Sequence, residues 1–115
     1  MTKMPPQTIP FSNVEFVPRF EHGDQCQIGA VATPEHGGEL GAGFARLTKA
    51  RIAWTIKYDE VLLCVEGGLA VHCAGYVHHL KPKDCLWLPA GTDLVYEADD
   101  ALVFYAIHPV NWAGS

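Results

Sequence analysis

Short apolar runs separated by glycine, proline and acidic residues recur along this chain. The runs are three to six residues long and rich in β-branched and aromatic residues, which is typical of strands. No apolar repeat at helical spacing persists for three turns. The pattern predicts strands at residues 14–17, 44–47, 51–56, 61–65, 69–73, 76–80, 86–88, 94–96 and 102–107.

Two segments indicate how these strands are arranged. The run at residues 61–65 is apolar throughout and is followed by Gly67 and Gly68, so we expect a strand that is covered on both faces. Ala74 and Gly75 separate two strand-length runs and predict a hairpin. Many short strands with frequent turn signals predict an all-β fold, either a sandwich or a barrel.

The chain has the length of one domain. If its 115 residues were divided, the two cores would be too small to be stable. A hydrophobic content of 49% is ample for one core, so we expect a single domain over residues 1–115. Pro5, Pro6 and Pro10 disfavour a helix at the beginning of the chain. Residues 1–15 are therefore predicted to form an extended N-terminal arm.

Composition and charge exclude several classes of partner. The net charge is -5 and no Lys/Arg cluster is present, so we expect no nucleic-acid binding. No apolar stretch approaches the ~18 residues that span a bilayer. Residues 1–10 lack the apolar core of a secretory signal, so the cytosol is the expected compartment. The four cysteines form no C-x-x-C pair and are expected to be reduced.

The residues around Glu60 resemble a known family. The string Trp-Thr-Ile-Lys-Tyr-Asp-Glu ends at Glu60, Val-Glu-Gly follows at residues 65–67, and Pro-x-Gly occupies residues 89–91. Further pieces are Glu-His-Gly at 35–37, Gly-Phe at 43–44 and Pro-x-Asn-Trp at 109–112. This pattern resembles the cupin superfamily and, more closely, the cupin domain of the EutQ family. The similarity spans residues 16–112.

The resemblance carries several implications. It implies a single-domain cupin jelly-roll β-barrel, usually a homodimer, often with exchanged N-terminal strands. It also implies a link to ethanolamine breakdown, and an acetate kinase-like activity has been ascribed to the family. Members usually carry an additional N-terminal region, which these 115 residues do not include. The chain has no P-loop motif, which weakens the kinase interpretation. Charged residues make up only 18% of the chain, which favours a surface covered by a partner copy.

Metal-binding cupins usually place two histidines before the glutamate and a third after the Pro-x-Gly motif. Here the first two positions fall on Trp54 and Ile56, or on Ala53 and Thr55 in the longer-spaced form, and the third falls on Leu94. A single carboxylate is too little for tight metal binding, because catalytic sites typically use three protein ligands. We therefore expect no metal and no other cofactor, with atypical metal ligands as the alternative.

Glu60 is the predicted centre of the site. Because side chains alternate along a strand, Tyr58, Glu60 and Leu62 share one face with Ile56 and Cys64. If that face points into the barrel, burial raises the pKa of the carboxyl and suits it to acid–base chemistry near neutral pH. Glu60 and Tyr58 are thus the candidate catalytic residues. The alternative is a structural carboxylate that accepts hydrogen bonds from the backbone or from Lys57, Arg51 or Arg46.

A ligand pocket is predicted around these two residues. Its expected lining includes aromatic and apolar side chains from several strands and one loop histidine, namely Trp54, Ile56, Leu62, Leu94, Tyr96, Tyr105 and His36. The expected function is binding or transformation of a small polar metabolite in the barrel. Two alternatives stay open, a non-catalytic dimeric binding or assembly module and a metal-dependent enzyme with atypical ligands. Whether the protein is an enzyme is left undecided by these patterns.

Overall fold

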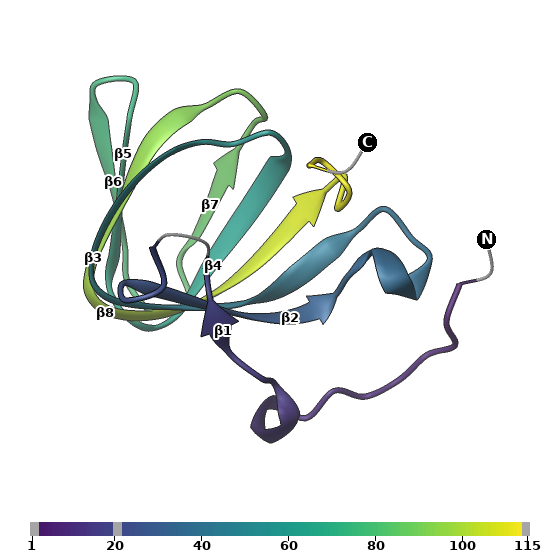
Figure 1. Cartoon of the computed structure of the whole chain (residues 1–115). Helices are drawn as coiled ribbons and strands as arrows, with labels where there is room; N and C mark the ends of the chain where they lie inside the picture. Colours follow the sequence, from purple (N-terminus) through teal and green to yellow (C-terminus); the bar gives the residue numbers. More distant parts are fainter. Residues whose placement is uncertain (1–2, 20–21, 114–115) are drawn as a thin grey trace.

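The computed structural model describes residues 3–19 and 22–113, and in this part of the chain the regular structure is almost entirely β (Figure 1). The strands are β1 (Val17–Pro18), β2 (Cys26–Ala32), β3 (Gly41–Thr55), β4 (Asp59–Gly67), β5 (Leu69–Cys73), β6 (Tyr76–Leu80), β7 (Cys85–Leu88) and β8 (Asp93–His108). All their pairings are antiparallel. The all-β prediction is therefore confirmed. No helix among the described residues is long and apolar enough to cross a bilayer.

The sheet runs in the order β1-β2-β3-β8-β4-β7, and β5 pairs with both β6 and β8. It curls so that β3 and β8 arch over one side of a barrel (Figure 1). Side chains at alternate positions of β3, β4 and β8 point inward and form one apolar core. Ile52, Ile56 and Cys64 are among its fully buried members.

Strands β3 and β8 are each longer than predicted. The sequence patterns indicated four separate strands here, because Thr48, Lys49, Asp99 and Asp100 interrupt the apolar runs. In the structure strands β3 and β8 stay paired on both sides of these polar residues, from Thr48 with Asp100 to Ala50 with Ala98. Lys49 lies between the two pairs with φ 45°. The polar residues therefore mark an irregularity where both strands bend, and they do not end the strands.

Two further predictions are corrected at the edges of the barrel. Strand β4 is covered on one face only within this chain, because Val61 and Val65 point outward and are exposed. The strand predicted at residues 14–17 is reduced to β1, which pairs with β2. Strand β2 was not predicted, because Cys-Gln-Ile-Gly-Ala-Val-Ala is rich in small residues and has no clear alternation.

The β5–β6 hairpin and the N-terminal arm follow the predictions more closely. Ala74 and Gly75 form the two-residue turn with φ 53° and 74°, the left-handed pair that suits a tight hairpin. Residues 3–10 are extended and exposed, and a short 3-10 helix, η1 (Phe11–Asn13), follows them. The arm runs away from the barrel wall before it returns at β1 (Figure 1).

Candidate functional site

The barrel contains a partly open cavity of about 330 Å³. Its lining is mostly aliphatic, with side chains from β1, β2, β3, β4, β5 and β8 and from the segments that follow β1, precede β4 and follow β8. Besides the Cys26 thiol and the Trp112 indole, five lining side chains carry charged or hydroxyl groups, namely Arg19, Tyr58, Glu60, Tyr96 and Tyr105. A small apolar chamber with a few convergent polar groups is the common form of a small-molecule site.

Glu60 lies at the centre of this polar group. It sits on β4 between Leu88 of β7 and Ile107 of β8, and only 5% of its surface is exposed. The hydroxyl of Tyr96 donates a hydrogen bond of 2.9 Å to Glu60 Oε1. Burial raises the pKa of Glu60 to about 7, although the Tyr96 hydrogen bond and the charge of Arg19 oppose the rise. The carboxyl is therefore partly protonated near neutral pH.

Tyr58 lies two residues before Glu60 and faces the same cavity. Its hydroxyl accepts a hydrogen bond of 3.2 Å from Trp54 Nε1 and a second from the Arg19 side chain. Burial, and then the nearby Glu60, raise the pKa of Tyr58, so it stays protonated. Because both bonds are accepted, the Tyr58 proton remains available to donate into the cavity.

Arg19 is a site residue that sequence reasoning missed. It directly follows β1, and its guanidinium lies 4.8 Å from the centre of the Trp54 ring, within the range of a cation–π contact. Its positive charge lowers the pKa of Glu60, Tyr96 and Tyr105 against the larger effect of burial. No motif marks Arg19, because its place at the cavity depends on the pairing of β1 with β2.

Tyr96 and Tyr105 are the other two tyrosines whose side chains line the cavity. Burial raises the pKa of Tyr105 to about 12 and that of Tyr96 well above its ordinary value, so both act as neutral donors. Tyr105 stands opposite Gly43 on β3. A Cβ atom at Gly43 would lie 2.7 Å from the Tyr105 hydroxyl and 2.7 Å from the carbonyl oxygen of Gly29. The absence of a side chain at Gly43 therefore gives Tyr105 its room.

The predicted site residues fall into two groups. Tyr58, Glu60, Leu62, Tyr96 and Tyr105 line the cavity together. The other four are outside the cavity lining. Trp54 contacts two lining residues, Tyr58 and Arg19. Ile56 and Leu94 are packed in the core, and His36 lies in the short 3-10 helix η3 (Pro34–His36).

His36 has a local structural contact in place of a cavity contact. Its Nδ1 accepts a hydrogen bond of 3.1 Å from the Thr33 amide, which caps the short helix. Two of the three cations expected as alternative structural partners of Glu60 are engaged elsewhere. Arg51 pairs with Glu97 on the outer face, and Arg46 lies over the Phe16 ring. The polar partner that Glu60 does have, Tyr96, comes from the part of β8 that pairs with β3 and β5 rather than with β4.

The donor set does not fit the metal centre that cupins usually carry. Trp54, Ile56 and Leu94 occupy the histidine positions, and they offer no coordinating atom for a divalent ion. Among residues 3–19 and 22–113, no group of three or more His, Cys, Asp or Glu side chains is placed to hold a metal. Glu60 has a tyrosine hydroxyl as its neighbour in place of a second ligand.

Comparison with known families identifies the chain. The family model for the ethanolamine utilisation protein EutQ matches residues 9–114. The chain belongs to the EutQ family. EutQ relatives named acetate kinase EutQ, from Escherichia coli K12 and Salmonella typhimurium LT2, are each 29% identical over 109 residues. These matches cover 92% of this chain and 46% and 47% of the two relatives. The chain thus spans about half the length of the curated relatives it matches.

Solved structures place this EutQ family member in the cupin fold. A putative ethanolamine utilization protein Q from Salmonella typhimurium LT2 superposes with a TM-score of 0.84 at 25% identity, covering 90% of this chain and 86% of that one. An RmlC-like cupin from Shewanella frigidimarina superposes with a TM-score of 0.75 at 15% identity, covering 94% and 95%. The prediction of a single-domain cupin jelly roll is confirmed.

Proposed function

We propose that the barrel cavity binds a small polar metabolite, with Glu60 and Tyr58 as its polar anchors. The observation that carries this proposal is a nearly buried carboxyl and three tyrosine hydroxyls facing one chamber of about 330 Å³. Polar side chains seldom gather inside an apolar barrel, because burying them costs stability unless each is hydrogen-bonded. Their convergence is therefore better explained by a ligand than by packing alone.

The chamber is rich in hydrogen-bond donors. Tyr58 and Tyr105 present hydroxyl protons, Arg19 presents a guanidinium, and Glu60 adds a proton when it is neutral. Such a set matches a ligand with acceptor oxygens, so we propose small carboxylates and carbonyl compounds as the first class to test. The relatives' names, which join acetate and ethanolamine utilisation, favour the same choice.

If the bound molecule reacts, the proposed chemistry is metal-independent acid–base catalysis. A carboxyl with a pKa of about 7 can both give and accept a proton at neutral pH. Tyr96 holds Oε1 of Glu60 in place, which leaves Oε2 as the oxygen for proton exchange with the ligand. Phosphoryl transfer is not part of the proposal, because the chain has no phosphate-binding loop motif.

The alternative of a non-catalytic binding module is supported by the same hydrogen bond. Because Tyr96 already satisfies part of the Glu60 carboxyl, the pair could fix a binding chamber without chemistry. The two functions separate by turnover: both predict binding that depends on Glu60, and only the enzyme predicts that a bound ligand is converted.

Glu60→Gln tests the proposal, with Glu66→Gln as its control. Both glutamates lie on β4, and Glu66 is exposed. A thermal-shift screen of short carboxylates, aldehydes, alcohols and amines first finds the ligand class, and calorimetry then measures affinity. We expect Glu60→Gln to weaken binding roughly 10- to 100-fold, the range for a lost hydrogen bond to a charged group. Glu66→Gln should bind as the wild type does. Equal affinity in all three proteins would contradict the proposal.

A further inference from the structure

The charges in the cavity come from very few side chains. Among the described residues that line it, Arg19 is the only cation. The other lining groups that titrate are Cys26 from β2, Tyr58 before β4, Glu60 from β4, and Tyr96 and Tyr105 from β8. The described lining residues from β1, β3, β5 and the segment after β8 carry no titratable group, and β7 pairs with Glu60 through Leu88. Near neutral pH the charge of the cavity is therefore set by Arg19 and Glu60.

The charge of Arg19 acts on the whole cavity. Burial raises the pKa of each of the five acidic groups, and the charge of Arg19 lowers it in every case. The guanidinium lies over the Trp54 ring and is hydrogen-bonded to the Tyr58 hydroxyl. Trp112 packs against these two rings, at 5.9 Å and 5.3 Å between ring centres. The aromatic side chains thus hold the positive charge at the cavity wall.

Arg19 lies nearer to solvent than Glu60 does. It follows Val17 and Pro18, which also line the cavity and are the exposed members of its lining, with Val17 at 55%. Arg19 itself is half-buried, whereas Glu60 is 5% exposed. A ligand that enters from this side therefore meets the cation first and the carboxyl afterwards.

An anionic ligand creates an imbalance of charge in this cavity. Arg19 supplies one positive charge, which balances one carboxylate but not two. When two carboxylates share a site, their repulsion raises the pKa of one of them, so that it takes up a proton. Glu60 is the group that protonates more easily, because burial already raises its pKa to about 7, whereas a small carboxylic acid in water has a pKa of ~4 to 5.

We propose that the cavity binds a small monocarboxylate with its negative charge at Arg19, and that Glu60 takes up one proton from solvent as the ligand enters. Tyr58 stands beside Arg19 and adds a hydroxyl donor for the ligand. Tyr96 keeps its hydrogen bond to Oε1 of Glu60, so Oε2 is the oxygen that carries the new proton. This inference rests on the proposed function and deepens it, because it selects anions over neutral carbonyl compounds and makes Arg19 the residue that selects them.

Calorimetry on the wild-type protein tests the proton uptake. The probes are straight-chain monocarboxylates of one to four carbons and the primary amides of the same lengths. At pH 8 Glu60 is ~90% ionised, because its pKa is about 7, so a bound carboxylate should take up about 0.9 proton. Titrations in two buffers with different ionisation enthalpies give this number from the difference in binding enthalpy. At pH 6 the uptake should fall to about 0.1 proton, and amides should take up none.

The pH dependence of affinity is a second readout. The carboxylate probes stay anionic from pH 6 to pH 9, since their own pKa is ~4 to 5. Their affinity should nevertheless fall by up to about tenfold per pH unit above pH 7, while amides should not lose affinity. Glu60→Gln assigns the proton, because it should abolish both the uptake and this pH dependence, whatever its affinity at a single pH.

Arg19→Met tests the selection of anions, with Arg46→Met as its control. Both arginines lie over an aromatic ring, Arg46 over Phe16 at 5.4 Å, and Arg46 is outside the cavity lining. Arg19→Met should weaken carboxylate binding by about tenfold or more, as expected for a lost charge-assisted hydrogen bond. It should leave amide binding within about twofold, which also shows that the cavity is intact. Arg46→Met should bind both kinds of probe as the wild type does.

The outcomes separate this inference from the proposed function. Carboxylates that bind at pH 8 without proton uptake overturn the inference and leave the proposed function standing. Binding of amides or aldehydes without binding of carboxylates does the same. If none of these probes binds, both are overturned. An equal loss of carboxylate and amide binding in Arg19→Met overturns the role of Arg19. The proton measurement uses wild-type protein, so it decides the question even if a variant does not fold.

Discussion

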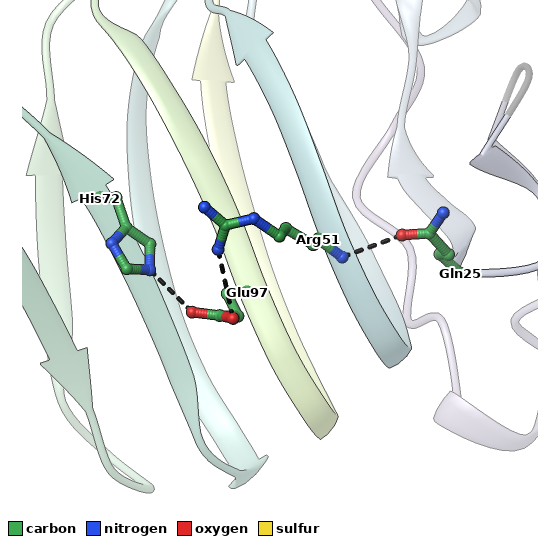
Figure 2. A network of polar contacts seen from close by, with 4 residues as sticks. All are labelled: Gln25, Arg51, His72 and Glu97. Carbon is green, nitrogen blue, oxygen red and sulfur yellow. Dashed lines mark hydrogen bonds and ion pairs between the residues drawn. The ribbon is translucent and has the colours of Figure 1, made fainter.

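Two glutamates in this protein are hydrogen-bonded to side chains of other strands, and their different burial moves their pKa values in opposite directions. Glu60 faces the cavity and accepts a hydrogen bond from Tyr96, and burial raises its pKa to about 7. Glu97, the next residue after Tyr96, points outward and joins His72 at 2.8 Å and Arg51 at 3.2 Å (Figure 2). The hydrogen bond from His72, with Arg51 also contributing, lowers the pKa of Glu97.

The comparison separates the effect of hydrogen-bond partners on a carboxyl pKa from the effect of burial. Tyr96 lowers the pKa of Glu60 as His72 lowers that of Glu97, yet the two carboxyls move in opposite directions. Desolvation is the larger effect only where the carboxyl is enclosed. The outer network extends to Gln25, whose Oε1 accepts from the Arg51 amide at 2.9 Å (Figure 2). Water reaches this network because its side chains are partly exposed. The network therefore suits a structural role in holding neighbouring strands together, and it does not suit acid–base chemistry.

The largest expected effect is on the pH dependence of stability, through Glu60→Gln. Folded Glu60 holds its proton up to about pH 7, and its ordinary pKa is 4.5. Between these values the folded state binds more protons, so this group lowers the free energy of unfolding as pH rises. At ~1.4 kcal/mol per pH unit the total is about 3 kcal/mol. Above pH 7, Glu60→Gln should therefore be the more stable protein.

Urea unfolding at a series of pH values measures this effect. The difference between the variant and the wild type should vanish toward acid pH and reach its full size above neutrality. Glu66→Gln, an exposed position on the same strand, should show no such pH-dependent difference. A Glu60→Gln difference that is constant with pH would mean that the carboxyl is not desolvated in the folded state.

A smaller effect is expected from Tyr96→Phe. The Tyr96 hydroxyl stabilises the charged form of Glu60, so its removal should raise the pKa of Glu60 further. A hydrogen bond to a charged group is worth ~1.5 kcal/mol or more, which corresponds to about one pH unit. Carboxyl NMR with labelled glutamate follows this titration directly. Tyr76→Phe, at an exposed tyrosine on the hairpin, is the control. An unchanged Glu60 pKa in Tyr96→Phe would show that the Tyr96 hydrogen bond does not affect the Glu60 pKa.

The smallest effect is expected from Glu97→Gln, and it has the opposite pH dependence. A carboxyl with a lowered pKa contributes stability above its ordinary value of 4.5 and loses it as pH falls through the folded value. Glu97→Gln should lower the melting temperature slightly at neutral pH and have no effect in acid. The effect is small because water screens exposed ion pairs. A neutral-pH loss as large as the Glu60→Gln gain would contradict the contrast drawn between the two sites.

Strand alternation was sufficient to predict the inner face of β4. Glu60, Leu62 and Cys64 alternate on the buried face of β4 as expected. Ile56 and Tyr58 are also buried, but they lie in the bend between β3 and β4, outside the strand in which they were predicted. A rigid two-residue period carries that information within a single strand. The depth of Glu60 in the barrel could therefore be anticipated without knowing the rest of the fold.

The partners of Glu60 could not be predicted in the same way. Tyr96 reaches it across the barrel and Arg19 reaches the cavity from beside β1, and both placements depend on how distant strands pair. Local patterns also failed where β3 and β8 bend, since a polar interruption in a strand looks like a turn. His36 was assigned to the pocket from a glycine-rich loop, although its ring bonds to Thr33.

The absence of a side chain at Gly43 has a consequence for the size of the ligand that the cavity is proposed to bind. Since any Cβ atom there would lie 2.7 Å from both the Tyr105 hydroxyl and the Gly29 carbonyl oxygen, a side chain at this position would have to displace the Tyr105 ring or strand β2. Under the proposed ligand binding, a residue that itself offers no functional group would thereby influence the room left for the ligand. Metabolites of two or three carbons and somewhat longer homologues could be sorted at this point, with the acidic centre left untouched.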